Sequence, residues 1–390
     1  MDGHKCTLTT VFFCWGHGVD FAASKAAKAA YSAPLGTVGY VSEVDALRCV
    51  AMTAVVAVHC RLLPFGWAGV WLFFVISGFA ITSSLLASDR MSHPKLLLLR
   101  NFYARRCLRI WPLYFLFVAA ALIPAAIAGN SHVLAFWPWL VTFSFNYYYI
   151  FHYSFPENCC WFGHLWTISV EEQFYVVFPF LFAFLSKRRL VAALWICIAL
   201  GPTLRTLLTW WLDQLSRNDE HILLIVYQFA PAHFDAFAAG ALLALFRPFL
   251  ALRLDLARVF MAVALAAAAA YTCVYLSINL STLGFHREAF RDMMFPRWGN
   301  GQQIWIFSVI IALASALIAL IFAGEGWLLN ACRLKLLRPI GRISYGAYLY
   351  HSPVLYLFEF LSLLLWPASI TKSGLTYYLV NSASAIWSRF

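Results

Sequence analysis

Charged residues are scarce in this chain. They make up 12% of its 390 residues, whereas soluble domains carry about 25%. Hydrophobic residues make up 63%, the mean hydropathy is +0.75, and apolar runs long enough to cross a bilayer recur along the chain. The shortage of charge excludes an ordinary soluble domain. It predicts an all-α fold, a polytopic bundle of transmembrane helices in the cell membrane, with the lipid bilayer as a partner.

The sequence also lacks the signatures of several functional classes. Its ten cysteines are scattered, and the close pair Cys159-Cys160 has neither the paired spacing nor the histidine partners of a zinc site, so no metal is expected. The net charge of +11 comes from basic residues in short connections between apolar runs, where they set orientation in the membrane. No nucleic-acid partner is therefore expected. Internal repeats, typical of secondary transporters, are not evident either.

The first forty residues lack the long apolar core of a signal peptide. We interpret 1–42 as an N-terminal extension on the cytoplasmic side, and 43–390 as the membrane domain.

The apolar runs predict about ten spans, at 46–62, 67–87, 110–128, 165–186, 190–212, 222–246, 258–279, 303–323, 345–366 and 374–388. A further apolar stretch, 134–150, is rich in aromatic residues. If it crossed the membrane, Lys187-Arg188-Arg189 and every later basic connection would lie outside. If it does not cross, they share the cytoplasmic side with the basic connection 88–109. The positive-inside rule favours the second arrangement, in which 134–150 lies in the outer interface and both termini are cytoplasmic.

The first predicted span carries two ionisable side chains, Arg48 and His59. Ten residues separate them, so they lie roughly 16 Å apart along the helix axis and on nearly the same face. Ionisable residues within a span are costly in lipid and are candidates for a functional site. The alternative is an arginine at the headgroups and a histidine bonded to a neighbouring helix.

Three arginines, Arg105, Arg106 and Arg109, crowd the end of the basic connection 88–109. Setting the topology would explain their charge. Guanidinium groups clustered at the mouth of a membrane bundle are also suited to bind phosphate groups through paired hydrogen bonds.

Other polar residues lie deeper in the predicted spans. Glu171, Glu172 and Arg205 are expected toward the outer side, and Asp235 is expected nearer the middle. Glu172 and Arg205 either belong to an outer polar chamber or form a plain buried ion pair. The small pair Ser77-Gly78 in the middle of its span is suited to close helix packing.

Six segments of the sequence, taken together, resemble the acyltransferase-3 family of integral-membrane O-acyltransferases. Members of this family modify surface polysaccharides and other extracytoplasmic acceptors. The similar segments occur in the family's order, and they are VDALRCVAMTAVVAVH (44–59), GVWLFFVISGFAIT (69–82), FYARRCLRIWPLY (102–114), HLWTISVEEQFYVVFP (164–179), FDAFAAGALLA (234–244) and GRISYGAYLYHSPV (341–354). The first of them has the family's spacing of ten residues between an arginine and a histidine. The ordered combination is far more specific than any one segment.

The resemblance implies a reaction and a donor. Acyl-CoA, with acetyl as the default acyl group, would enter from the cytoplasm as a substrate, and no tightly bound cofactor is expected. Its phosphates would lie near Arg106 and Arg109, with Arg105 and Arg48 adding positive charge. His59 would either deprotonate the acceptor hydroxyl or carry the acyl group transiently.

The resemblance also implies an extracytoplasmic acceptor hydroxyl, for which we expect a cell-surface glycan. A lipid-linked glycan, a small secreted metabolite and an antibiotic-like molecule are the alternatives. Glu171 or Glu172 would orient His59 or hold this acceptor. Ser77, Arg205, Asp235, Tyr345 and His351 would line the substrate path, and His351 is either a second functional histidine or a structural one bonded across helices. The family often carries a soluble hydrolase-like domain after the membrane bundle, and its absence here leads us to expect a stand-alone enzyme. Two alternatives are a multi-span transporter or exporter and a non-catalytic binding partner.

Overall fold

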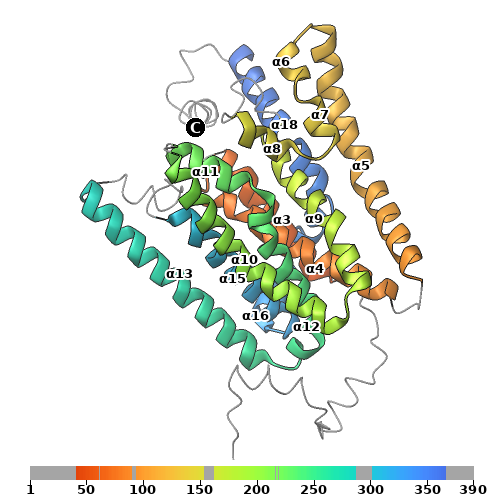
Figure 1. The fold of residues 1–390 in the computed structure, drawn as a ribbon, viewed down its shortest axis with the longest axis vertical. Coiled ribbons are helices and arrows are strands. Elements are labelled where there is room, and N and C mark those ends of the chain that lie inside the picture. The colour runs from red at the N-terminus through yellow and green to blue at the C-terminus, as the bar shows by residue number, and fades with distance from the viewer. Residues whose placement is uncertain are drawn as a thin grey trace, which may run out of the picture. The chain divides into compact units, whose positions relative to one another are not determined.

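The computed structural model describes residues 41–60, 62–89, 94–152, 162–215, 217, 219–286 and 301–365. They belong to one compact unit, Val41–Phe390. Every regular element within these ranges is helical (Figure 1), which confirms the predicted all-α fold. The N-terminal extension predicted at 1–42 and the last predicted span at 374–388 lie outside the described residues, except that Ser42 begins the first helix described.

The long helices are α3 (Ser42–His59), α4 (Gly69–Asp89), α5 (Lys95–Ile127), α9 (Leu165–Phe184), α10 (Lys187–Gln214), α12 (Phe234–Leu250), α13 (Leu254–Leu283), α15 (Gln302–Phe322) and α18 (Ser344–Leu365). Shorter helices connect them, namely η1 (Gly66–Ala68), α6 (Ser131–Leu134), α7 (Trp137–Val141), α8 (Phe145–His152), α11 (Asp219–Gln228), η2 (Ala230–His233), α16 (Gly326–Cys332) and α17 (Leu337–Arg342). All but the last of the predicted spans coincide with helices.

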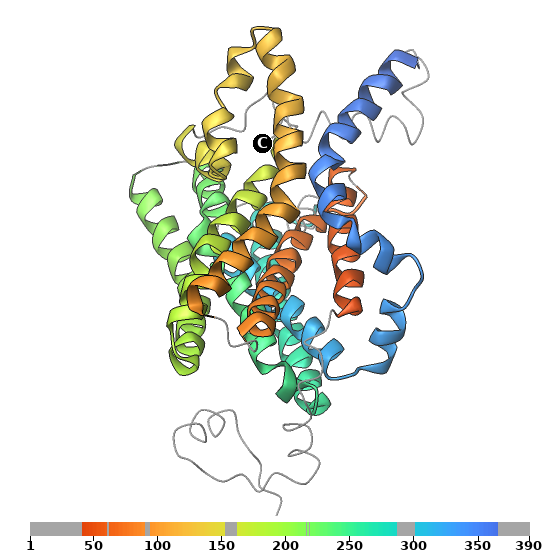
Figure 2. The ribbon, with the colours of Figure 1, turned by 90° about the vertical axis from the view of Figure 1, so that its right-hand side faces the viewer.

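Seven helices among the described residues are long and apolar enough to cross a membrane, at Gly66–Asp89, Lys95–Ile127, Leu165–Phe184, Lys187–Gln214, Ala230–Leu250, Leu254–Leu283 and Gln302–Phe322. The first predicted span, α3, is more polar than these because Glu43, Asp45 and Arg48 lie in its first two turns. It packs against α4, α17 and α18, and Figure 2 shows α18 beside it. The polar helix is therefore covered by other helices of the bundle.

Two boundaries differ from the prediction. Helix α5 begins at Lys95 rather than at 110, and its 33 residues extend about 50 Å. Arginine and leucine are good helix formers, so the basic segment is the first part of the helix rather than a connection. The predicted span 222–246 is divided into α11 and α12 by the short η2, where Pro231 has no backbone N–H to continue an α-helix.

The aromatic stretch 134–150 forms short helices. The longest, α8, has 8 residues and extends about 12 Å, less than half the thickness of a bilayer core. The hydroxyl of Tyr114 in α5 donates a hydrogen bond to the carbonyl of Leu140 at 2.9 Å, which ties the stretch to the bundle. None of the helices described in this stretch is long enough to cross a bilayer, as predicted.

Helices α4 and α12 approach each other closely at two glycines. A β-carbon at Gly78 would lie 2.0 Å from the carbonyl oxygen of Phe237, and one at Gly240 would lie 1.9 Å from that of Val75. Small residues allow such contact between membrane helices. The packing role predicted for the Ser77-Gly78 pair is confirmed for Gly78. The contact also fixes the position of the neighbouring Ser77 along the helix axis relative to α12.

We expect Gly78→Ala to lower the stability of the bundle by about 1–3 kcal/mol, because the added methyl group has no room beside α12. Thermal unfolding of the detergent-solubilised protein measures the loss. Gly326→Ala is the matched control, since a β-carbon there would meet nothing within 4 Å. Equal unfolding temperatures for the two variants would contradict the close contact.

Candidate functional site

A cavity lies among the inward faces of α3, α4, α5, α9 and α18, next to the end of α17. Its polar lining residues are Arg48, Ser77, Arg106, Arg109, Thr167, Glu171, Arg342, Ser344, Tyr345 and Tyr348. Residues three or four apart share a helix face. In α9 this spacing brings Thr167, Ile168 and Glu171 to the cavity, and in α18 it brings Ser344, Tyr345 and Tyr348. The site is therefore assembled from segments that lie far apart in the sequence.

Four arginines form the cationic part of the cavity, and we call Arg48, Arg106, Arg109 and Arg342 the arginine cluster. A guanidinium nitrogen of Arg48 lies 2.9 Å from a carboxylate oxygen of Asp45. Arg342 lies 3.7 Å from the other oxygen of the same carboxylate. One buried aspartate therefore bonds to Arg48 and forms a longer ion pair with Arg342, whose side chain is 62% exposed.

Arg105 and Arg106 of the basic segment have different surroundings. The Arg106 guanidinium lies over the ring of Tyr175, 4.3 Å from its centroid. This arginine lies roughly 17 Å from the start of α5. Arg105 is exposed and donates to the hydroxyl of Ser88 at 3.0 Å, and it does not line the cavity.

The two adjacent glutamates of α9 face different surroundings. Glu171 lines the cavity, and one of its carboxylate oxygens accepts hydrogen bonds from the hydroxyls of Ser77 and Tyr175. Glu172 lies outside the cavity lining, beside Trp111, whose indole nitrogen is 3.5 Å from one carboxylate oxygen. The other oxygen of Glu172 is buried without a hydrogen-bond partner. Of the two glutamates, only Glu171 therefore lines the cavity.

His59, His164 and His351 meet in what we call the histidine cluster. The ring centroid of His351 lies 4.9 Å from that of His59 and 4.8 Å from that of His164. Tyr348 connects the cluster to the cavity: its ring centroid lies 5.4 Å from that of His351, and its hydroxyl lies 2.7 Å from that of Thr167. The cavity therefore extends from the arginine cluster to a tyrosine that contacts the histidine cluster.

Sequence reasoning missed Arg342, His164 and Tyr348. The signal for His164 was present, since it lies three residues before Thr167 and seven before Glu171, on the same face of the segment. Tyr348 lies three residues after the predicted Tyr345 and three residues before the predicted His351, which also places it on their side of the helix. The predicted Tyr345 lines the cavity, and its hydroxyl donates to the carbonyl of Ile110 at 3.2 Å.

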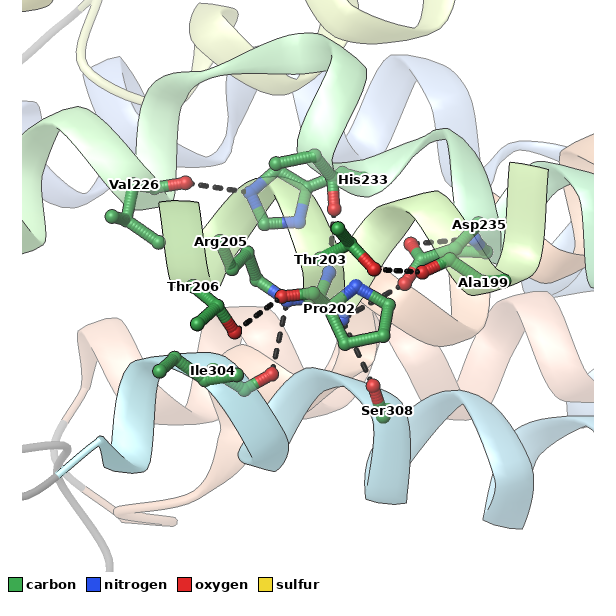
Figure 3. A network of polar contacts seen from close by, with 12 residues as sticks. Ala199, Pro202, Thr203, Arg205, Thr206, Val226, His233, Asp235, Ile304 and Ser308 are labelled. Carbon is green, nitrogen blue, oxygen red and sulfur yellow. Dashed lines mark hydrogen bonds and ion pairs between the residues drawn. The ribbon is translucent and has the colours of Figure 1, made fainter. Parts of the chain in front are cut away.

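Arg205 and Asp235 form a separate network that does not line the cavity (Figure 3). Their side chains are 2.9 Å apart and almost fully buried, with exposed fractions of 0% and 3%. Arg205 also donates to Ser308 and to the carbonyls of Ala232 and Ile304. The partner of Arg205 is thus Asp235, which corrects the alternative of a Glu172–Arg205 pair. This network joins α10, η2, α12 and α15.

We expect Arg205→Met to reduce the stability of the protein by about 3–5 kcal/mol, because it leaves the buried Asp235 carboxylate without a cation. Combining it with Asp235→Asn restores part of the loss. The unfolding temperature in detergent measures both effects. Arg253→Met is the control, since Arg253 and Asp255 form an exposed pair, and its unfolding temperature should stay near that of the wild type. A wild-type unfolding temperature for Arg205→Met would contradict the structural role of the network.

The fold and the site define a polytopic helical membrane protein with an internal polar cavity that approaches a histidine cluster. Residues 41–387 match the model of the acyltransferase domain family. The chain therefore belongs to the acyltransferase-3 family, which confirms the resemblance seen in the sequence.

Curated relatives match most of this chain. The O-acetyltransferase OatA of Staphylococcus aureus (strain NCTC 8325 / PS 47) is 26% identical over 337 residues, which cover 81% of this chain and 51% of the relative. The peptidoglycan O-acetyltransferase OatA of Listeria monocytogenes is 28% identical over 339 residues, covering 81% and 49%. The putative peptidoglycan O-acetyltransferase YrhL of Bacillus subtilis is 27% identical over 338 residues, covering 82% and 49%. The chain thus spans about half the length of these relatives. No solved structure matches the chain.

Proposed function

We propose that this protein transfers an acyl group, acetyl by default, from acyl-CoA to a hydroxyl of an extracytoplasmic glycan. The observation that carries the proposal is the single cavity that holds the arginine cluster and reaches Tyr348, which contacts the histidine cluster. The cavity thus offers a place for the phosphates of a donor, and the proposed base lies in a cluster that Tyr348 separates from the cavity. Membership of the acyltransferase-3 family supports the same reaction class.

The arginine cluster is the proposed donor site. Four guanidinium groups supply paired donors for the phosphates of CoA. Asp45 holds Arg48 and Arg342 close together before the donor binds, so fewer side-chain conformations are lost on binding. Arg105, which we expected to add charge here, has no place in this proposal because it does not line the cavity.

His59 is the proposed base, because a neutral imidazole accepts a proton near neutral pH. His59 takes the proton of the acceptor hydroxyl while the oxygen attacks the thioester carbonyl. The new C–O bond forms, the C–S bond breaks, and the CoA thiolate takes the proton from His59. Glu171, with the hydroxyls of Ser77 and Tyr175 bonded to it, lines the path between the two ends.

The proposed acceptor is a glycan, and this choice draws on the relatives named peptidoglycan O-acetyltransferases. The proposed topology places both termini in the cytoplasm, since the basic residues of 88–109, Lys187-Arg188-Arg189 and the later connections then share one side. Acyl-CoA then reaches the arginine cluster from the cytoplasm, and the histidine cluster faces the outer side.

We expect His59→Ala to abolish transfer of radiolabelled acetyl groups from acetyl-CoA to cell-envelope material in isolated membranes, because the base for the hydroxyl is lost. Membrane insertion and unfolding temperature should be those of the wild type. Equal labelling by the two proteins would contradict a role for His59 in transfer, and fractionation of the labelled product identifies the acceptor.

The double variant Arg106→Ala/Arg109→Ala should weaken acetyl-CoA binding by about tenfold or more, because two charge-assisted contacts to phosphate are lost. Equilibrium binding of labelled acetyl-CoA to the purified protein measures the change. Arg105→Ala removes one positive charge from the same helix outside the cavity and should bind like the wild type. Unchanged affinity in the double variant would contradict the donor site.

The topology is testable by labelling single cysteines on a background without native cysteines. A cysteine at Asn130 should react with an impermeant thiol reagent added to intact cells, because the proposed topology places that position outside. A cysteine at Lys187 should react only after the membrane is opened. Labelling of position 187 in intact cells would mean that 134–150 crosses the membrane.

A further inference from the structure

His351 lies in contact with both other members of the histidine cluster. Its ring is buried, with 6% of its surface exposed, as is that of His164. His59 is partly exposed at the end of α3, so it is more open to a substrate than the other two. The titratable groups that face His351 are His59 from α3, His164 immediately before α9, and Tyr348 from its own helix.

The hydrogen bonds define which nitrogen of His351 carries its hydrogen. Nδ1 of His351 bonds to the backbone carbonyl of Tyr348. A carbonyl only accepts, so Nδ1 carries the hydrogen and Nε2 keeps a free lone pair. Nε2 is buried without a hydrogen-bond partner, which is unfavourable for a polar atom. His351 therefore presents an unused acceptor inside the cluster.

The imidazole of His59 is the neighbouring group that can supply a hydrogen to this acceptor. A hydrogen bond between ring nitrogens needs a separation of about 3 Å. The two ring centroids are 4.9 Å apart, and a ring nitrogen lies about 1.2 Å from its centroid, so rotation of the His59 ring alone can bring its N–H to Nε2 of His351 while the bond of His351 to Tyr348 stays in place. His164 packs against the same His351 ring and limits its movement.

We propose that His351 is a positioning residue for His59, an inference that rests on the function proposed above. Nε2 of His351 accepts the N–H of His59, which leaves the other nitrogen of His59 free for the acceptor hydroxyl. When His59 takes the hydroxyl proton it becomes an imidazolium, and its bond to His351 stabilises the charge. His59 then gives the proton to the CoA thiolate, so His351 ends the cycle unchanged.

Two substitutions separate this role from a structural one. His351→Asn keeps a donor near the position of Nδ1 for the Tyr348 carbonyl and removes the acceptor that faces His59. His351→Gln loses that donor but places an amide oxygen near the position of Nε2, where it accepts from His59. His233→Gln is the matched control: His233 is also buried, with Nε2 bonded to the carbonyls of Val226 and Tyr227 and Nδ1 unpartnered, but it packs against Trp71 and Phe307 outside the cavity lining.

We expect His351→Asn to lower kcat for acetyl transfer by about tenfold or more while KM for acetyl-CoA stays unchanged, because only the base is affected. His351→Gln should lose less, and His233→Gln should match the wild type. The acidic limb of the kcat–pH profile should move to lower pH in His351→Asn, since His59 without its acceptor holds a proton less tightly. Wild-type kcat in His351→Asn, or equal losses in both His351 variants with an unshifted profile, would overturn the proposal.

A measurement independent of turnover tests the basis of the proposal. Nitrogen-15 NMR of histidine-labelled protein in detergent, with His351→Asn used to assign the signal, should show His351 with its hydrogen on Nδ1 and its Nε2 as an acceptor. A hydrogen on Nε2 would overturn the inference even if the protein transfers acyl groups. Lack of transfer by the wild type would refute the proposed function, and with it the catalytic role of His351, while leaving the NMR assignment as a separate result.

Discussion

Polar side chains on membrane helices must find partners inside the bundle, because lipid offers no hydrogen bonds. This constraint organises the molecule. Helix α3 carries Asp45, Arg48 and His59, and it packs against α4, α17 and α18. Close backbone contacts at Gly69 of α4 and Gly341 of α17, where a β-carbon would lie 2.4 Å from the carbonyl oxygen of Ala51 and 1.8 Å from that of Asp45, bring these helices against α3.

The buried polar side chains of the bundle differ in how fully they are hydrogen-bonded. Arg205 and Asp235 form a closed network in which the guanidinium donates to a carboxylate, a hydroxyl and two carbonyls. The histidine cluster beside the cavity leaves hydrogen-bonding capacity unused, as the unpartnered Nε2 of His351 shows. A closed network favours rigidity, whereas unused donors and acceptors around a cavity favour binding of a ligand. We therefore assign structure to the first set and chemistry to the second.

Some of the predicted polar residues line the cavity, and the others belong to the buried network or lie apart from both. Arg48, Ser77, Arg106, Arg109, Glu171 and Tyr345 were predicted as site residues, and the structure brings them together at one cavity. Arg205 and Asp235 were grouped with them because a buried charge in a span looks the same in either setting. Glu172 was grouped with Glu171 because the two are adjacent, yet adjacent residues of a helix point about 100° apart. Helix periodicity could have separated these two glutamates. The partners of Arg205, in contrast, depended on how α12 and α15 pack against its helix.

The sequence by itself determined the membrane class, the helices and the placement of Arg48 and His59 on one helix, because hydropathy and helix periodicity depend on residues close in the chain. It also determined the family, through an ordered set of short segments. Only the tertiary structure decided that His164 and His351 join His59, that Asp45 holds Arg342, and that Arg205 pairs with Asp235. These pairings join residues from different helices, and the packing of the helices decides which of their faces meet.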